Sequence, residues 1–396
     1  MGVYGEYLNT PGLMQNFDAQ TAERKNQIRR ISQIRGASRK TDVLVFAADL
    51  NKPIPGIPIN ITYGDVLPIS DQLSNLKGDR LDLILETPGG MGEVAEEIVR
   101  LIRGRYEEFA VIVPGWAKSA GTILAMAADE ILMGPTSALG PIDAQLSWQG
   151  KTFSADALLE GFDKIKEEVQ ASGVLNKAYI PSLQNISPGE LQEARNALKF
   201  ATELVTDWLV QYKFKDWNEH SSTHQPVTPE EKKERAAAIA AQLCDHRRWR
   251  THGRSIKIAD LRAMRLNITD YSTQPDLADA VMRYYALMQI SFQSNLYKIY
   301  ETADSQVMKF LMPQVPPPQQ FLQPVGVAEH AILNFQCPKC KATSQIQANL
   351  GTPQPLQPGS LPFPQNSKFR CPKCGVEHDL TDARRQLEAQ SKKPVV

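Results

Sequence analysis

A serine among small residues is the side chain of this sequence best suited to nucleophilic chemistry. Ser119 lies in the stretch KSAGT, residues 118–122, directly before small apolar residues that predict a helix. At the start of a helix, free backbone N–H groups and the positive end of the helix dipole can stabilise a developing oxyanion. Gly89 and Gly90 can present further unpaired N–H groups, because a backbone without Cβ can approach a substrate closely. These two turns predict acyl-transfer chemistry with Ser119 as the nucleophile.

Strands and helices in alternation must position both turns. The apolar runs at 81–85 and 109–113 predict two buried strands, each stopped by proline and glycine. Between them, residues 92–101 carry apolar side chains at helical spacing and charged side chains on the other face, which predicts an amphipathic helix. A second helix begins near the serine. The repeated order of strand, turn and helix indicates an α/β fold.

Four motifs in this order resemble the serine dehydrogenase proteinase family, which is related to signal peptide peptidase A and to the Clp protease proteolytic subunit. The motifs are ETPGG at 86–90, AKSAGT at 117–122, AADEI at 127–131 and LGPID at 139–143. The resemblance covers roughly residues 16–290 and implies a ClpP/crotonase-like stack of ββα units with added helices. It also implies that Ser119 attacks the peptide carbonyl, while N–H groups of Gly89 or Gly90 and of Ala120 hold the oxyanion.

A serine hydroxyl needs a base to take its proton, and the sequence leaves that base open. The Clp subunit uses a histidine about 25 residues after the serine, but here Asp143 occupies roughly that place, and no histidine lies between Ser119 and His220. Relatives of signal peptide peptidase A use a lysine further on, which would need a pKa lowered by burial. We therefore predict Lys151 as the base, with His252 as the rival. Asp143 is expected to orient a partner or to cap a turn.

Two C-x-x-C pairs near the C-terminus predict a metal site. They are Cys337 with Cys340 and Cys371 with Cys374. Each pair aims two thiolates at one point, and four thiolates complete a tetrahedral zinc site. The match is to a zinc ribbon in which Zn²⁺ is structural, because a small module with little core needs the metal for its folding energy. The proline-rich stretch 351–364 is expected to be a loop extruded from the ribbon.

The 396 residues are enough for two or three domains. A long helix is predicted over 276–312 and a proline-rich linker after it. The predicted domains are an N-terminal helical arm at 1–40, a ClpP/crotonase-like serine peptidase domain at 41–290, a helix end and linker at 291–328, and a zinc ribbon at 329–396.

Composition argues against two classes of partner. With 44 basic and 44 acidic residues the formal net charge is zero, so no global field attracts nucleic acid or an anionic membrane. The N-terminus lacks a basic region followed by an apolar core, and no apolar run reaches the ~18 to 20 residues that a bilayer span requires. We expect a cytoplasmic protein without a membrane span of its own.

The expected function is hydrolysis of peptide bonds in peptides or unfolded proteins. The resemblance also implies a homo-oligomer, since the related proteases are ring-like or stacked. Two alternatives stay open at this point. One is a catalytically inactive binding or scaffold protein that keeps the fold, and the other is a crotonase-type acyl-CoA enzyme, which would need a catalytic glutamate and no nucleophile.

Overall fold

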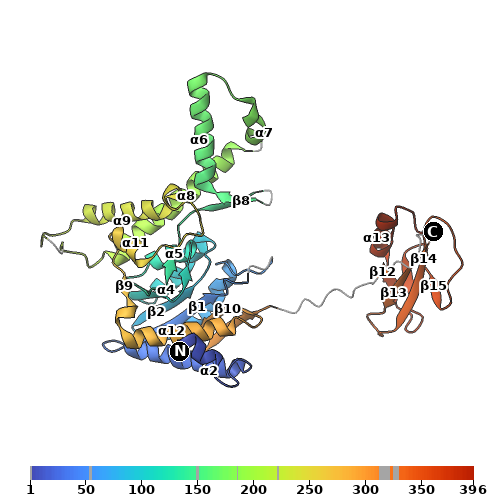
Figure 1. The fold of residues 1–396 in the computed structure, drawn as a ribbon, viewed down its shortest axis with the longest axis horizontal. Helices are drawn as coiled ribbons and strands as arrows, with labels where there is room; N and C mark the ends of the chain where they lie inside the picture. The colour runs from blue at the N-terminus through green and yellow to red at the C-terminus, as the bar shows by residue number, and fades with distance from the viewer. Residues whose placement is uncertain are drawn as a thin grey trace. The chain divides into compact units, whose positions relative to one another are not determined.

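The computed structural model describes residues 2–52, 56–148, 151–184, 186–220, 223–311, 322–323 and 330–396. The chain divides into two compact units, Met1–Leu311 and Met312–Val396. The first unit is an α/β domain built on a seven-stranded sheet of order β11-β10-β1-β2-β3-β5-β9 (Figure 1). The strands of this sheet are β1 (Thr41–Ala48), β2 (Arg80–Glu86), β3 (Glu108–Val113), β5 (Glu130–Met133), β9 (Thr269–Asp270), β10 (Leu296–Glu301) and β11 (Gln306–Phe310).

The central strands β1, β2, β3 and β5 run parallel, and β10 and β11 add an antiparallel edge. A parallel sheet is covered on both faces, which explains why its strands appear in the sequence as apolar runs without alternation. The helices that carry one core cluster with the sheet are α3 (Val66–Ser74), α4 (Gly92–Arg103), α5 (Ala120–Met126), α8 (Pro188–Trp208), α9 (Pro229–Cys244) and α11 (Ile258–Ala263). A second cluster lies under α2 (Phe17–Arg35) and α12 (Pro275–Ser291). The sheet therefore sits between two helical layers.

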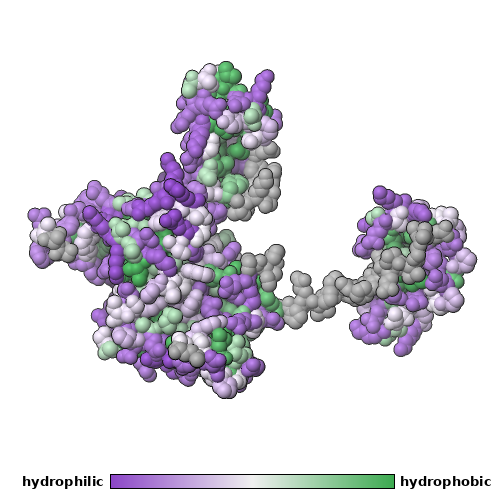
Figure 2. Space-filling model, viewed as in Figure 1, coloured by the Kyte–Doolittle hydropathy of each residue, from purple (hydrophilic) through white to green (hydrophobic). Residues whose placement is uncertain are grey.

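Further helices and strands belong to the first unit. They are α1 (Val3–Leu8), β4 (Trp116–Ala117), β6 (Ala138–Leu139), β7 (Gln145–Trp148), β8 (Lys151–Ser154), α6 (Ala155–Ser172), α7 (Ile180–Leu183) and α10 (His246–Trp249). The helices α6 and α7 extend away from the sheet (Figure 1). Figure 2 shows apolar residues on this extension, where Val174, Leu175 and Ile180 are exposed. The apolar residues of α6 are not packed into the core, because only its first residue, Ala155, is buried.

The predicted helix over 276–312 is wrong beyond Ser291, where α12 ends. The chain turns and returns as β10 and β11, with β10 paired antiparallel to β1. Apolar and aromatic residues in LYKIYE fit a buried strand as well as a helix, so spacing alone could not separate the two. Residues 1–40, predicted as an arm, pack within the first unit, where α2 lies against α12.

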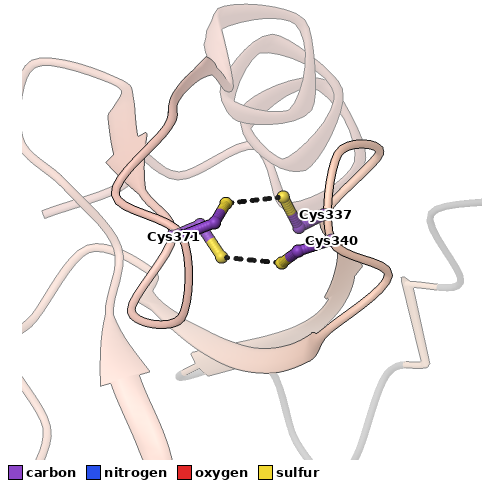
Figure 3. Close-up of side chains that lie close together, drawn as sticks. Cys337, Cys340 and Cys371 are labelled. Atoms are coloured by element: carbon purple, nitrogen blue, oxygen red, sulfur yellow. Dashed lines mark hydrogen bonds between the residues drawn. The ribbon is translucent and has the colours of Figure 1, made fainter.

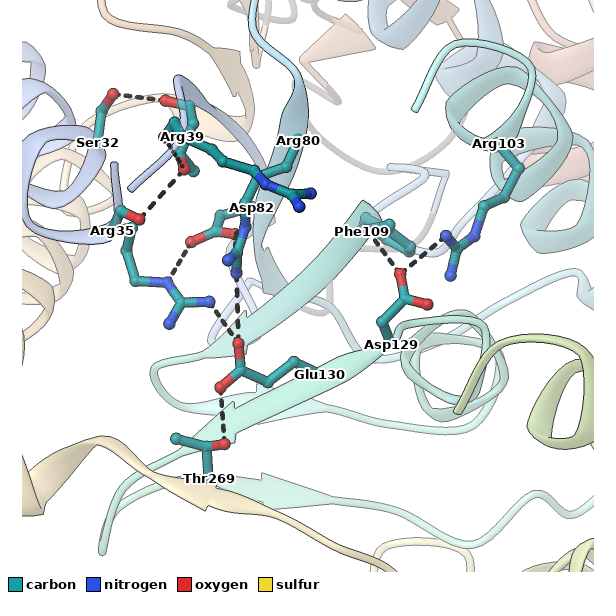
Figure 4. Close-up of polar contacts among 11 residues, drawn as sticks. Ser32, Arg35, Arg39, Arg80, Asp82, Arg103, Phe109, Asp129, Glu130 and Thr269 are labelled. Atoms are coloured by element: carbon teal, nitrogen blue, oxygen red, sulfur yellow. Dashed lines mark hydrogen bonds and ion pairs between the residues drawn. The ribbon is translucent and has the colours of Figure 1, made fainter. Parts of the chain in front are cut away.

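A network of charged side chains lies at the amino ends of the parallel strands of the sheet (Figure 4). Arg35 donates to Asp82 at 2.7 Å and to Glu130 at 2.5 Å, which joins α2 to β2 and β5. Burial alone would raise the pKa of Glu130, but the facing guanidinium of Arg35 more than offsets it and holds that pKa below its ordinary value. Ligands of parallel α/β sheets bind beyond the opposite, carboxyl ends of the strands, so we assign this network to stability.

In its described residues, the second unit is a small β module with one helix. Its core gathers Leu333, Phe335, Ile346, Phe369 and Leu387 around two of the cysteines. Its elements are β12 (Leu322–Gln323), β13 (His330–Gln336), β14 (Thr343–Asn349), β15 (Ser360–Pro362), β16 (Lys368–Arg370), β17 (Glu377–Asp379) and α13 (Thr381–Ser391). The stretch 351–364 is not simply an extruded loop, because β15 pairs with β14 and Phe363 is buried.

Candidate functional site

Ser119 lies in a strained turn between β4 and α5. Its φ is 51° and its ψ is −116°, a backbone conformation that L side chains rarely adopt. Such outliers cost free energy and cluster at functional sites. The Ser119 side chain makes no capping hydrogen bond to α5. The ordinary structural reason for a serine before a helix is therefore absent at this position.

Gly89 allows a second turn, residues 87–90, to pack closely against Ser119. A Cβ at Gly89, whose φ is 102°, would lie 2.6 Å from the Cβ of Ser119. Only a glycine permits this approach. The two turns are also joined by backbone hydrogen bonds, because Thr87 N–H donates to Trp116 O at 2.8 Å and Lys118 N–H donates to Thr87 O at 3.0 Å.

Two backbone N–H groups beside Ser119 are without acceptors in the described part of the chain. They belong to Gly90 and Ala120. Gly89 N–H donates to Thr87 Oγ1 at 3.2 Å and is therefore occupied. Of the two glycines that the motif offered, only Gly90 keeps a backbone N–H without an acceptor among the described residues.

A cavity of about 930 Å³ opens at this serine. Ser119, Gly90 and Ala120 line it together with Asp143 and His252. Its remaining wall is mixed, with apolar residues such as Ile123, Ile142 and Phe200 beside polar ones such as Glu93, Glu193 and Asn196. The cavity is large enough for a segment of polypeptide, and it brings residues far apart in the sequence to one place.

Asp143 is the acidic centre of this cavity, with 3% of its surface exposed. Its carboxylate accepts hydrogen bonds from Ser154 Oγ at 2.6 Å, Gln145 Nε2 at 2.7 Å and His246 Nδ1 at 3.1 Å. Nδ1 of His252 lies 3.8 Å away, beyond hydrogen-bond distance, and is buried without a partner among the described residues. Burial would raise the pKa of Asp143, but the facing His252, Ser154 and His246 more than offset it, so this pKa lies below its ordinary value.

The segment that carries the histidines is held alongside the LGPID motif. Ile142 N–H donates to Leu243 O at 2.9 Å, and Leu139 and Ile256 form an antiparallel bridge. Lys118 turns away from the cavity and donates from Nζ to the carbonyl of Gly253 at 2.8 Å. These contacts fix the loop on which His252 lies.

Lys151, the predicted base, is at the tip of the β7–β8 hairpin, but its side chain lies outside the described part of the chain. His246 was missed by the sequence interpretation. It lies 103 residues after Asp143, and no local pattern signals their contact.

Glu86 ties the end of β2 to the segment that leads to Ser119. Its buried carboxylate accepts hydrogen bonds from Gly115 N–H at 3.1 Å and Trp116 N–H at 2.8 Å. Burial raises its pKa to about 8, although these two N–H groups and Tyr285 partly oppose the shift. Glu86 is thus committed to holding the turns together.

The four cysteines of the second unit form a compact cluster (Figure 3). All four sulfurs lie within 4.8 Å of one another. Cys337 Sγ is 3.6 Å from Cys374 Sγ, and Cys340 Sγ is 3.7 Å from Cys371 Sγ. Four sulfurs bound tetrahedrally at ~2.3 Å from a zinc ion are about 3.8 Å apart. The cluster can therefore hold a metal ion without rearrangement.

His378 also faces this cluster, with Nε2 3.3 Å from Cys337 Sγ. Its ring is half-buried against Phe335. An imidazole N–H directed at a ligand sulfur is the kind of contact that orients a thiolate from outside the coordination sphere.

The parallel sheet thus carries a strained serine turn that faces a Gly-Gly turn at its carboxyl end. Residues 8–182 match the family model of ClpP-like SDH-type serine proteinases. This match spans less than half of the chain and confirms the resemblance drawn from the four motifs, all of which lie within it.

Two proteins of known sequence are similar to parts of this chain. An uncharacterized protein of Methanocaldococcus jannaschii is 30% identical over 187 residues, 45% of this chain and 61% of its own length. A second uncharacterized protein of that organism is 35% identical over 89 residues, 22% of this chain and 29% of its own length. The chain thus spans less than two thirds of both relatives.

Among solved structures, a mutant of the membrane-bound stomatin-specific protease 1510-N is 26% identical, with a TM-score of 0.22, 29% of this chain and 60% of that chain covered. A mutant of ClpP1 from Listeria monocytogenes is 11% identical, with a TM-score of 0.30, 60% of this chain and 94% of that chain covered. In the described part of the present chain, no helix is both long and apolar enough to cross a bilayer.

Proposed function

We propose that the first unit is a serine endopeptidase that hydrolyses peptide bonds in peptides or unfolded proteins. The observation that carries the proposal is the placement of Ser119, strained and without a capping role, in one cavity with Asp143 and His252. The family match supports a serine peptidase, and the residues and their roles are our assignment.

His252 acts as the base in this proposal and Asp143 orients it. Nδ1 of His252 faces the Asp143 carboxylate, which leaves Nε2 for the proton of the Ser119 hydroxyl. As the Ser119 oxygen bonds to the peptide carbonyl carbon, the N–H groups of Gly90 and Ala120 stabilise the oxyanion. The imidazolium then gives its proton to the leaving amine as the C–N bond breaks. A water molecule, deprotonated by the same histidine, releases the acyl group from the serine.

Replacing each candidate base in turn tests whether His252 or Lys151 takes the proton of Ser119. We expect His252→Ala to lower kcat for casein hydrolysis by about 10² to 10⁴, the usual contribution of a general base. Asp143→Asn should lower it by a similar order, because the carboxylate orients the ring, whereas Lys151→Ala should change it by less than about threefold. Initial rates with fluorescently labelled casein measure these effects.

The matched control is His224→Ala, whose imidazole is exposed and does not line the cavity. It should leave the rate unchanged. Loss of activity in Lys151→Ala with full activity in His252→Ala would instead assign the base to the lysine. If the wild-type protein hydrolyses neither casein nor activated esters, the inactive binding-protein alternative replaces our proposal.

We further propose that the four cysteines hold one structural Zn²⁺. Cys337, Cys340, Cys371 and Cys374 lie at the spacing that tetrahedral zinc requires. Four thiolates leave no open coordination position, so the ion would supply folding energy and no Lewis-acid step.

We also propose an assembly state and a cellular location for this protein. We infer a cytoplasmic homo-oligomer that acts on peptides or unfolded chains, with no nucleic acid partner. The assembly is supported by the likeness to ClpP-like proteinases and by the exposed apolar residues Val174, Leu175 and Ile180.

A further inference from the structure

Lys298 and Asp65 form one of the two entirely buried ion pairs in the described part of the first unit. Lys298 Nζ lies 2.7 Å from Asp65 Oδ1 and 2.9 Å from Asp65 Oδ2, and neither side chain is exposed. Taking two charges out of water costs several kcal/mol, and well-packed apolar residues often replace such pairs without loss of stability. Stability alone is therefore a poor explanation for this pair.

The two side chains of the pair hydrogen-bond to the two ends of a short segment, residues 60–62. Lys298 Nζ donates to the carbonyl of Asn60 at 2.7 Å. Asp65 Oδ2 accepts the N–H of Thr62 at 2.7 Å. The position of residues 60–62 is thus set by β10 on one side and by the start of α3 on the other.

Residues 60–62 in turn form backbone hydrogen bonds on both sides of Gly90, in the turn of residues 87–90. Ile61 N–H donates to Gly89 O at 2.7 Å, and Met91 N–H donates to Ile61 O at 3.0 Å, so both bonds flank Gly90. In a bridge of this kind the N–H of the central residue points to the opposite side. A Cβ on Gly90 would lie 2.4 Å from the backbone of Ile61, which shows how closely the two segments pack.

We propose that Lys298 and Asp65 are positioning residues for the oxyanion site. They fix residues 60–62, which fix the direction of the Gly90 N–H in the cavity. The inference rests on the proposed function, and Lys298 lies outside the family match at residues 8–182. The Lys298–Asp65 pair acts on the geometry of oxyanion stabilisation. The pH dependence of the reaction rate, which the base sets, should therefore stay unchanged.

The test replaces the pair by apolar residues, Lys298→Met with Asp65→Leu, which avoids an unpaired buried charge. The readout is the second-order rate constant for phosphonylation of Ser119 by a fluorophosphonate, measured from pH 6 to 9. A displacement near 1 Å at a catalytic group costs about 100-fold. We therefore expect the rate to fall by about 10- to 100-fold at every pH, with the midpoint of the profile unmoved.

A second buried pair on the same strand provides the matched control. Arg24 and Glu301 are 2.9 Å apart with no exposed side-chain surface, and Glu301 accepts a tyrosine hydroxyl as Asp65 does. Among the described residues, this pair makes no hydrogen bond or ion pair with residues 60–62. Arg24→Met with Glu301→Leu should alter the melting temperature by a similar amount and leave the rate within about threefold.

Equal slowing in both double variants, or no slowing in either, would overturn the inference. If the first double variant does not fold, Tyr300→Phe removes one donor to Asp65 and keeps the ion pair. It should slow phosphonylation by about two- to fivefold, and an unchanged rate would count against the inference. A wild-type protein that is not phosphonylated contradicts the proposed function itself, which keeps the two failures distinct.

Discussion

Ser119→Ala is expected to lower kcat for casein hydrolysis by about 10⁴ to 10⁶, since removing the nucleophile of a serine protease leaves only binding and oxyanion stabilisation. The fold should not change, because the Ser119 side chain makes no capping hydrogen bond that alanine would lose. Circular dichroism and thermal unfolding should match the wild-type protein.

The control for this variant is Ser74→Ala, an exposed serine on α3 that bonds only to the carbonyl of Asp71 among described residues. It should retain full activity. Hydrolysis by Ser119→Ala at more than about a tenth of the wild-type rate would mean that another group is the nucleophile.

Removal of the metal is expected to unfold the second unit. Structural zinc contributes about 10 to 16 kcal/mol in small modules of this kind, as much as the whole folding free energy of a typical domain. Purified protein should contain one zinc per chain by elemental analysis. A strong chelator should abolish hydrogen-exchange protection in residues 330–396 and leave the labelling of Ser119 by a fluorophosphonate unchanged.

Two cysteine variants test the assignment of ligands. Cys371→Ser removes one thiolate of the cluster and should lower the zinc content to well below one per chain. Cys244→Ser is the matched control, since Cys244 lies in the first unit and packs against its apolar core. Protection of residues 330–396 that survives complete metal removal would contradict a structural role for zinc.

The turns of the site could be predicted because their chemistry is local. Ser119, Gly89 and Gly90 lie within short motifs whose small residues, prolines and flanking apolar runs indicate strand ends and helix starts. The cysteine cluster could be predicted for the same reason, since each C-x-x-C pair is a complete local unit.

The partners of these turns could not be predicted in the same way. His246 meets Asp143 across 103 residues, and Lys298 meets Asp65 across 233. Such contacts depend on tertiary packing that no local period encodes. The error at β10 had the same origin, because its apolar and aromatic residues fit a helix as well as the sheet edge that β1 provides.

The central claim is that Ser119 is an activated nucleophile in the cavity with His252. The most direct measurement is fluorophosphonate labelling of the full-length protein, read by intact mass, beside Ser119→Ala, His252→Ala and Lys151→Ala. We predict one adduct per chain on the wild-type protein and on Lys151→Ala, none on Ser119→Ala, and slow labelling of His252→Ala. An unlabelled wild-type protein, or an adduct that persists in Ser119→Ala, would contradict the claim.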